Sequence, residues 1–104
     1  MSAMFVEVPT LSLGNGMVIS FASLPSKGGL KRGTKNVPSH LISKVNVSLE
    51  GEKHGSFDVR ASLESVTKGK PKVEVSFISR PLEMTFRQLR MAEEWIVEEF
   101  LRLI

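Results

Sequence analysis

The amino-acid sequence predicts a single α+β domain, in which an antiparallel β-sheet with one apolar and one polar face is followed by one amphipathic helix. Apolar and polar residues alternate along three central segments, and apolar residues recur three and four positions apart near the end of the chain. With 104 residues the chain has the length of one ordinary domain. The predicted divisions are a hairpin at 1–24, a basic loop at 25–40, a central sheet at 41–79 and a helix at 80–104.

The first predicted element is a β-hairpin. Residues 4–13 and 17–24 are rich in Val, Ile, Leu and Phe, and the Gly14-Asn15-Gly16 segment between them tolerates the positive φ angles of tight turns. Pro9 cannot donate a ladder hydrogen bond, so a sheet edge or a bend is expected there. We therefore expect this hairpin at the periphery of the sheet.

A loop separates the hairpin from the central sheet. Residues 25–40 contain three glycines, two prolines and four basic residues, which is a composition typical of loops. Residues 1–45 contain five Lys and Arg residues against a single Glu, within a net charge of +3 for the whole chain. A basic segment of this kind indicates either a polyanionic partner or a solvated loop.

Three alternating segments, 41–50, 57–64 and 72–77, form the centre of the predicted sheet. Their period of two is that of strands with one buried face. The turns between them, 51–55 and 67–71, are rich in Gly and Lys. The polar face would present Lys44, Asn46, Ser48, Ser56, Asp58, Arg60, Ser62, Lys72, Glu74 and Ser76.

The last element is a helix. Ser79 or Thr85 can cap it: Pro81 in the first turn favours the former, and Gln88 completes a capping-box pattern with the latter. The residues predicted to form one apolar stripe are Leu82, Phe86, Leu89, Ile96, Phe100 and Leu103. Other apolar residues, among them Trp95 and Val97, lie off this stripe, so the helix is apolar on more than one side.

This surplus of apolar surface predicts a homodimer. A helix is about 10 Å wide, whereas five strands about 4.8 Å apart span more than twice that width. One helix should therefore leave part of the sheet uncovered, unless the first hairpin folds over it. We expect a second copy to supply the missing cover, with Phe86, Leu89, Ile96, Phe100 and Leu103 at the interface.

The sequence contains no pattern typical of an enzyme. Gly28 and Gly33 have the outer spacing of a P-loop, but Thr34-Lys35 follow in the wrong order and Pro38 prevents a helix close behind. His40 and His54 are expected alone in turns, and the helix glutamates on a solvated face. Because the chain has no cysteine, thiolate chemistry is excluded, and we predict neither a metal nor another cofactor. No apolar run is long enough for a membrane span, and no small-molecule substrate is expected.

The order of these elements resembles the coat proteins of the single-stranded RNA bacteriophages, the leviviral coat family. TLSLGNGMVISF resembles the family's opening hairpin, and VPSHLISKVNVSLEG the entry into its central sheet. GSFDVRASLESV resembles the strand that pairs with this entry, and KPKVEVSFIS the last strand before a Glu/Arg-rich amphipathic helix. The resemblance covers nearly the whole chain.

The resemblance implies a structural capsid protein. Dimers would interlock, with the C-terminal helix of each subunit over the partner's sheet, and would assemble into an icosahedral shell in the cytoplasm of a bacterial host. The polar face would point inward to genomic single-stranded RNA, with the helices and the first hairpin outside. The RNA-facing role would fall on the ten polar-face residues above, and the Lys68-Gly69-Lys70 turn would match the loop at the symmetry axes.

Two other classes of protein fit the same pattern of elements. One is a single-stranded nucleic-acid-binding dimer of the Whirly type, which pairs a curved sheet with a C-terminal helix. Proteins that bind single strands usually stack bases on aromatic residues, and the predicted polar face has none. The other is an interaction module without a nucleic-acid role, which would fit the acidic residues on the sheet.

Overall fold

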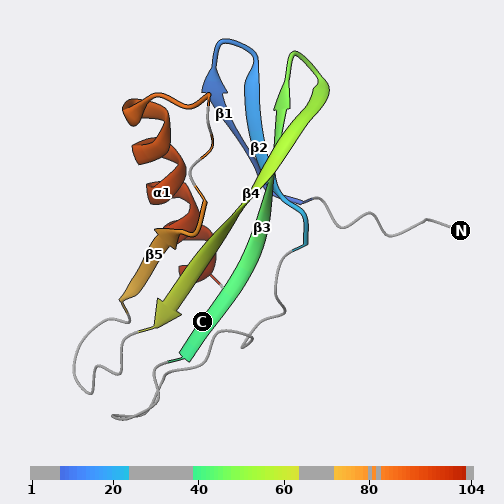
Figure 1. Ribbon diagram of the computed structural model, residues 1–104. Helices are drawn as coiled ribbons and strands as arrows, with labels where there is room; N and C mark the ends of the chain where they lie inside the picture. The colour runs from blue at the N-terminus through green and yellow to red at the C-terminus, as the bar shows by residue number, and fades with distance from the viewer. Residues whose placement is uncertain (1–7, 24–38, 64–71, 80, 82, 103–104) are drawn as a thin grey trace, which may run out of the picture.

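The computed structural model describes residues 8–23, 39–63, 72–79, 81 and 83–102 (Figure 1). Within these residues, five strands precede one helix in the chain, as the sequence predicts. The elements are β1 (Thr10–Gly14), β2 (Met17–Phe21), β3 (Ser39–Leu49), β4 (Glu52–Leu63), β5 (Val73–Phe77) and α1 (Phe86–Leu101). Most of the predicted basic loop, together with Lys68 and Lys70, lies outside the described residues.

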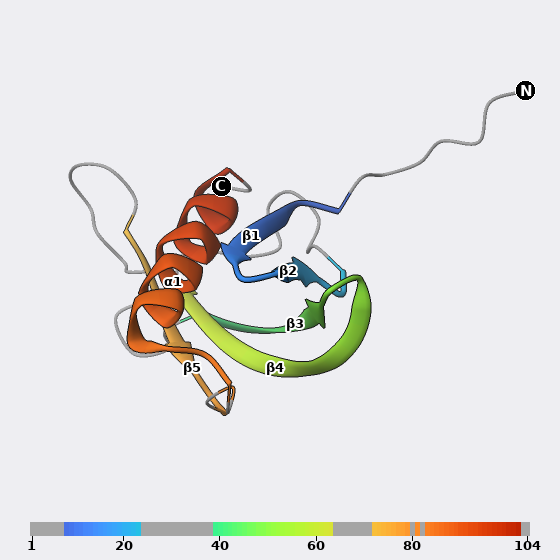
Figure 2. The same cartoon turned by 90° about the horizontal axis from the view of Figure 1, so that it is seen from above.

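The five strands form one antiparallel sheet in the order β1-β2-β3-β4-β5. The sheet curls strongly, so that β1 and β5 approach the same helix from opposite sides (Figure 2). Two irregularities in pairing favour this curvature, because a bulge bends its strand and increases the local twist. In β1 the extra residue is Leu13, between Ser12 and Gly14, and in β4 it is His54, opposite Val47 and Ser48.

The first hairpin lies at the periphery of the main sheet, as the sequence predicts, and it is paired with the central strands. Met17 pairs with Leu49 and Phe21 with Val45, so β2 continues the central sheet along its full length. The apolar side chains of β2 are thereby added to the core side of β3. β1 is the edge strand, and Pro9 directly precedes it, in agreement with the sheet edge expected for a residue that cannot donate a ladder hydrogen bond.

Both histidines lie in strands, not in the turns where they were expected. His40 is the second residue of β3, which begins at Ser39, so the strand starts before the predicted end of the loop. His54 belongs to β4, because the turn between β3 and β4 is shorter than predicted and consists of Glu50 and Gly51. Their φ angles of 53° and 84° are those of a tight hairpin turn.

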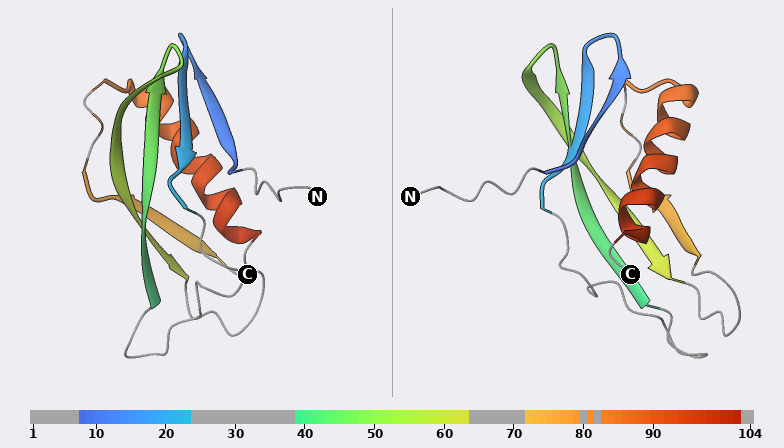
Figure 3. Two further views of the ribbon diagram at one scale, coloured as in Figure 1. Left: turned by 90° about the vertical axis from the view of Figure 1, so that its right-hand side faces the viewer. Right: turned by 180° about the vertical axis from the view of Figure 1, so that it is seen from behind.

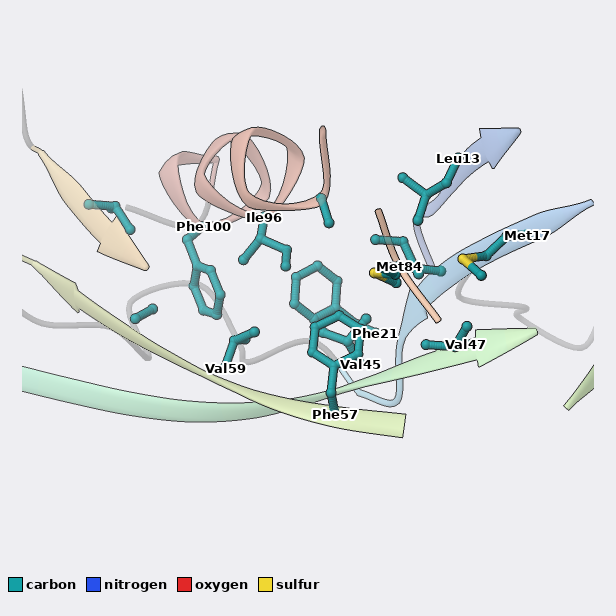
Figure 4. Close-up of a cluster of buried hydrophobic side chains, with 14 of the residues drawn as sticks. Leu13, Met17, Phe21, Val45, Val47, Phe57, Val59, Met84, Ile96 and Phe100 are labelled. Carbon is teal, nitrogen blue, oxygen red and sulfur yellow. The ribbon is translucent and has the colours of Figure 1, made fainter. Parts of the chain in front are cut away.

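The core fills the concave side of the curled sheet. The predicted alternation is confirmed: Val45, Val59 and Ala61 are fully buried, as are Ile96 and Phe100 on the facing helix. Figure 4 shows Ile96 and Phe100 pointing from α1 toward the side chains of the sheet. Met84, in the segment before α1, packs into the same cluster.

The helix starts at Phe86, six residues later than the predicted boundary, because Thr85 is its cap. The Thr85 side chain accepts a hydrogen bond from the backbone N–H of Gln88, and the backbone N–H of Thr85 donates to the Gln88 side chain at 2.9 Å. This is the capping box that the second cap alternative predicted. Ser79 is therefore not the cap.

The buried face of α1 differs from the predicted stripe. Phe86 is 78% exposed, whereas Trp95, which lies off the stripe, stacks on Phe21 with ring centroids 5.2 Å apart. Gln88 and Glu99 are polar but buried. The buried face of the helix therefore includes residues that a pattern of apolar residues does not identify. The helix runs obliquely across the concave side, as Figure 3 shows from two sides.

One helix covers more of the sheet than a flat geometry allows. The estimate that α1 is too narrow assumed strands lying side by side in a plane. In the curled sheet, β1 and β5 both contact α1, and the concave side is filled within one chain. Coverage of the sheet therefore does not by itself require a second copy.

Candidate nucleic-acid interface

The convex side of the sheet is a polar surface that spans all five strands. Because residues paired in register point to the same side, the pairing defines rows of neighbouring side chains across the sheet. The helix lies on the opposite side, so no described element covers this surface (Figure 2). We refer to it as the polar face.

Two rows near the β1–β2 and β3–β4 turns are almost free of charge. One row contains Thr10, Ser20, Asn46 and Ser56, and the next contains Ser12, Val18, Ser48 and Lys53. The Ser48 hydroxyl donates a hydrogen bond of 3.3 Å to the backbone carbonyl of Val18. We call the six hydroxyl and amide residues of these rows the neutral block: Thr10, Ser12, Ser20, Asn46, Ser48 and Ser56.

The other end of the polar face contains charges of both signs. Lys44 faces Asp58 in register, and Arg60 lies between Ile42 and Ser76. Glu74 faces Ser62 and forms an ion pair with Lys72, with the Lys72 Nζ and Glu74 Oε1 atoms 3.9 Å apart. Both partners of this ion pair are more than half exposed, so solvent screens their attraction. We call this region the charged part.

The structure brings the predicted polar-face residues together on one side. The nine that lie in strands occupy adjacent positions on β3, β4 and β5, and Lys72 directly precedes β5. The sequence analysis missed Thr10, Ser12, Ser20 and Lys53. The alternation of Ser12 with Leu11 and Leu13 was visible in the sequence, but only the central segments were assigned to the polar face.

The residues predicted at the dimer interface fall into different environments. Ile96 and Phe100 are in the core of their own chain, and Leu89 is half-buried against the same core. Phe86 is exposed at the start of α1, and Leu103 lies outside the described residues. The contacts that bury Ile96 and Phe100 are therefore already made within one chain.

A cavity of about 360 Å³ lies on the concave side, near the bulge in β4. Met17, Val47, Phe57 and Met84 contribute its apolar lining. His54 lies beside it, and the Nε2 atom of His54 is 2.9 Å from Oε2 of Glu83. This contact corrects the expectation that His54 stands without a carboxylate, and the separation of the two residues in sequence explains why no local spacing predicted it.

Within the described residues, no group of three or more His, Cys, Asp or Glu side chains is arranged to hold a metal ion. No helix in this part of the chain is long and apolar enough to cross a membrane. In comparisons with known proteins, the chain matches no family model, no curated protein and no solved structure.

Proposed function

We propose that this chain is the coat protein of a single-stranded RNA bacteriophage, and that its polar face lies against packaged RNA inside the virion. The observation that supports this function is a five-stranded sheet with one side filled by its own helix and the other side polar and uncovered. Such a surface offers hydrogen-bonding groups and cations over several strands, which suits a single strand lying across it.

Basic residues outside the polar face add to the attraction for RNA. Lys27, Lys31, Arg32 and Lys35 lie between β2 and β3, and Lys68 and Lys70 lie between β4 and β5. Contacts with phosphate require only such cations and no base-specific geometry. RNA packaging by this chain would therefore depend on salt more than on sequence.

The unpaired edge of β5 supports a dimer. The backbone N–H of Ile78 donates to the Asp58 carbonyl at 3.0 Å, which fixes the alternation of hydrogen bonds along the strand. The backbone groups of Glu74 and Ser76 then point toward β4, and those of Val73, Val75 and Phe77 point away from the sheet. No described strand pairs with this side of β5. The β5 edge of a second copy presents the same unpaired backbone N–H and C=O groups.

Two β5 edges are complementary in an antiparallel arrangement centred on Val75. Val75 then faces its own copy, and Val73 faces Phe77 of the other subunit, so every outward backbone group meets a partner. Glu74 faces Ser76 of the other subunit, which avoids opposing like charges. The two sheets would continue as one, and this contact needs neither Ile96 nor Phe100.

A single cysteine tests this contact cleanly, because the chain contains none. In the proposed pairing the Val75 Cα atoms of two subunits lie about 5.5 Å apart, within disulfide range. Val75→Cys should form a covalent dimer under mild oxidation. Ile78→Cys is the matched control: its two copies would lie about 20 Å apart at strand spacing, so no link should form. Equal cross-linking of both variants would contradict the pairing.

Assembly and RNA content test the coat function directly. The purified protein should form closed particles in electron microscopy, and these particles should contain RNA that resists nuclease until the shell is disrupted. Dissociation at high salt should release the RNA, since phosphate contacts weaken as salt rises. Discrete dimers without RNA would overturn the proposal.

A second function is favoured by one observation. The sheet is curved and the single C-terminal helix lies on its concave side, an arrangement that also fits a free single-strand-binding dimer of the Whirly type. Described positions of the polar face contain no aromatic residue on which bases would stack. Discrete dimers that bind short single strands without forming particles would favour this alternative over the coat function.

A further inference from the structure

The neutral block differs in chemistry from the rest of the polar face. Five of its six side chains carry a hydroxyl and one carries an amide. They are distributed over β1, β2, β3 and β4 in two adjacent rows. Thr10, Ser12 and Ser56 are exposed, and the other three are half-buried. Groups of this kind both donate and accept hydrogen bonds and have no net charge.

Two lysines border the neutral block on β3 and β4. Lys44 precedes Asn46 by two residues, on the same side of β3, and Lys53 faces Ser48 from β4. At strand spacing the two lysines are about 14 Å apart, with the paired residues Asn46 and Ser56 between them. Both side chains are exposed. Two cations separated by neutral hydrogen-bonding groups complement a ligand that has separated negative charges and neutral polar groups between them.

Single-stranded RNA has this distribution of groups. Its phosphates are separated by riboses and bases, whose 2′-hydroxyls and edges donate and accept hydrogen bonds. The 2′-hydroxyl is absent from DNA, so a hydroxyl and amide surface can distinguish the two nucleic acids. Resting on the RNA-binding function proposed above, we infer that the neutral block binds riboses and bases next to phosphates held by Lys44 and Lys53, and that it makes this chain prefer RNA over DNA.

This inference gives the first hairpin a role in binding. Thr10, Ser12 and Ser20 supply half of the neutral block, and they reach the polar face only because β2 pairs with β3. The ligand would therefore lie over β1 to β4 near the hairpin turns. The charged part, where Lys44 and Arg60 have acidic neighbours, would contribute less to the preference for RNA.

The test compares two sets of variants of the full chain as dissociated dimers. Binding to an RNA oligonucleotide and to DNA of the same sequence is measured by fluorescence anisotropy over a series of salt concentrations. Thr10→Val, Ser12→Ala and Ser20→Ala are combined to remove hydroxyls from the hairpin. Ser62→Ala and Ser76→Ala, in the charged part of the same face, serve as the matched control. Circular dichroism establishes that each variant is folded.

We expect the hairpin variant to bind RNA about tenfold more weakly, the loss expected from a few hydrogen bonds, with DNA binding nearly unchanged. Its salt dependence should stay that of the unmodified protein. Lys44→Gln with Lys53→Gln should lower the salt slope by about 0.7 per lost phosphate contact while retaining the preference for RNA.

Other outcomes distinguish this inference from the proposed function. If the unmodified protein and the hairpin variant show the same preference for RNA over DNA, the neutral block does not have this role. That outcome would leave the proposed coat function standing. Loss of preference in the control variant instead would also overturn the role of the neutral block and place the discrimination in the charged part. Unmodified protein that binds no RNA would overturn both proposals.

Discussion

The two sides of the curled sheet differ in burial and in polarity, although the same strands form both. On the concave side, alternate residues of β2, β3 and β4 are buried against α1. There the ring of Phe21 from β2 stacks on the ring of Trp95 from α1. On the convex side, the intervening residues face one another in register without a covering element. Most residues of these strands therefore belong either to a packed core or to an uncovered surface that is mainly polar.

This difference separates stability from binding. A buried side chain contributes through dispersion and through the removal of apolar area from water, and its loss leaves a cavity. A side chain on the polar face can hydrogen-bond to water in both the folded and the unfolded protein. Its removal therefore changes the free energy of unfolding little. Substitutions on the convex side should therefore report on ligand binding, and those on the concave side on folding.

The largest expected effect is on the concave side. Phe100 is fully buried between α1 and the sheet and contacts Phe21 edge to face, with ring centroids 5.7 Å apart. Phe100→Ala should lower the free energy of unfolding by about 3–5 kcal/mol, as large-to-small core substitutions do. Urea denaturation at a fixed protomer concentration measures this change, since a dimer makes stability depend on concentration.

Leu101→Ala is the control for this substitution. Leu101 is the next residue of the helix but is 37% exposed, so its truncation should cost less than about 1 kcal/mol. Similar losses for the two variants would mean that the buried face of α1 is assigned wrongly. The helix would then pack in another way, for example over the sheet of a second copy.

A smaller effect is expected where the chain enters α1. The capping box of Thr85 and Gln88 satisfies backbone groups at the helix start and aligns the helix over the concave side. Thr85→Ala should destabilise the protein by about 1 kcal/mol. A double-mutant cycle with Gln88→Ala, followed by thermal denaturation, should show coupling between the two positions. Additive losses would show that the two side chains act independently.

The sequence predicts what depends on local periodicity. Alternation alone identified the buried residues of β4, including Ala61, because the side-chain period of a strand is two. The capping box was visible for the same reason, since its partners are three residues apart. The burial of Gln88 and Glu99 was not predictable in this way, because it depends on how the helix is placed against the rest of the chain and not on their own polarity.

The parts that sequence analysis missed depend on long-range pairing. The pairing of Phe21 with Val45 joins the hairpin to the sheet, and no short pattern in either segment specifies it. The same pairing brings Ser20 beside Asn46, so half of the neutral block was overlooked. The contact between His54 and Glu83 also joins distant segments.

The smallest expected effect is on the polar face itself. Lys44 and Asp58 face each other in register, and exposed pairs of this kind contribute only a few tenths of a kcal/mol. In a double-mutant cycle with Lys44→Ala and Asp58→Ala, the coupling in unfolding free energy should stay below about 0.5 kcal/mol. RNA affinity should behave differently: Lys44→Ala should weaken it, and Asp58→Ala should strengthen it by removing a nearby negative charge. A coupling above 1 kcal/mol would mean that the two charges satisfy each other and that Lys44 has little attraction left for a phosphate.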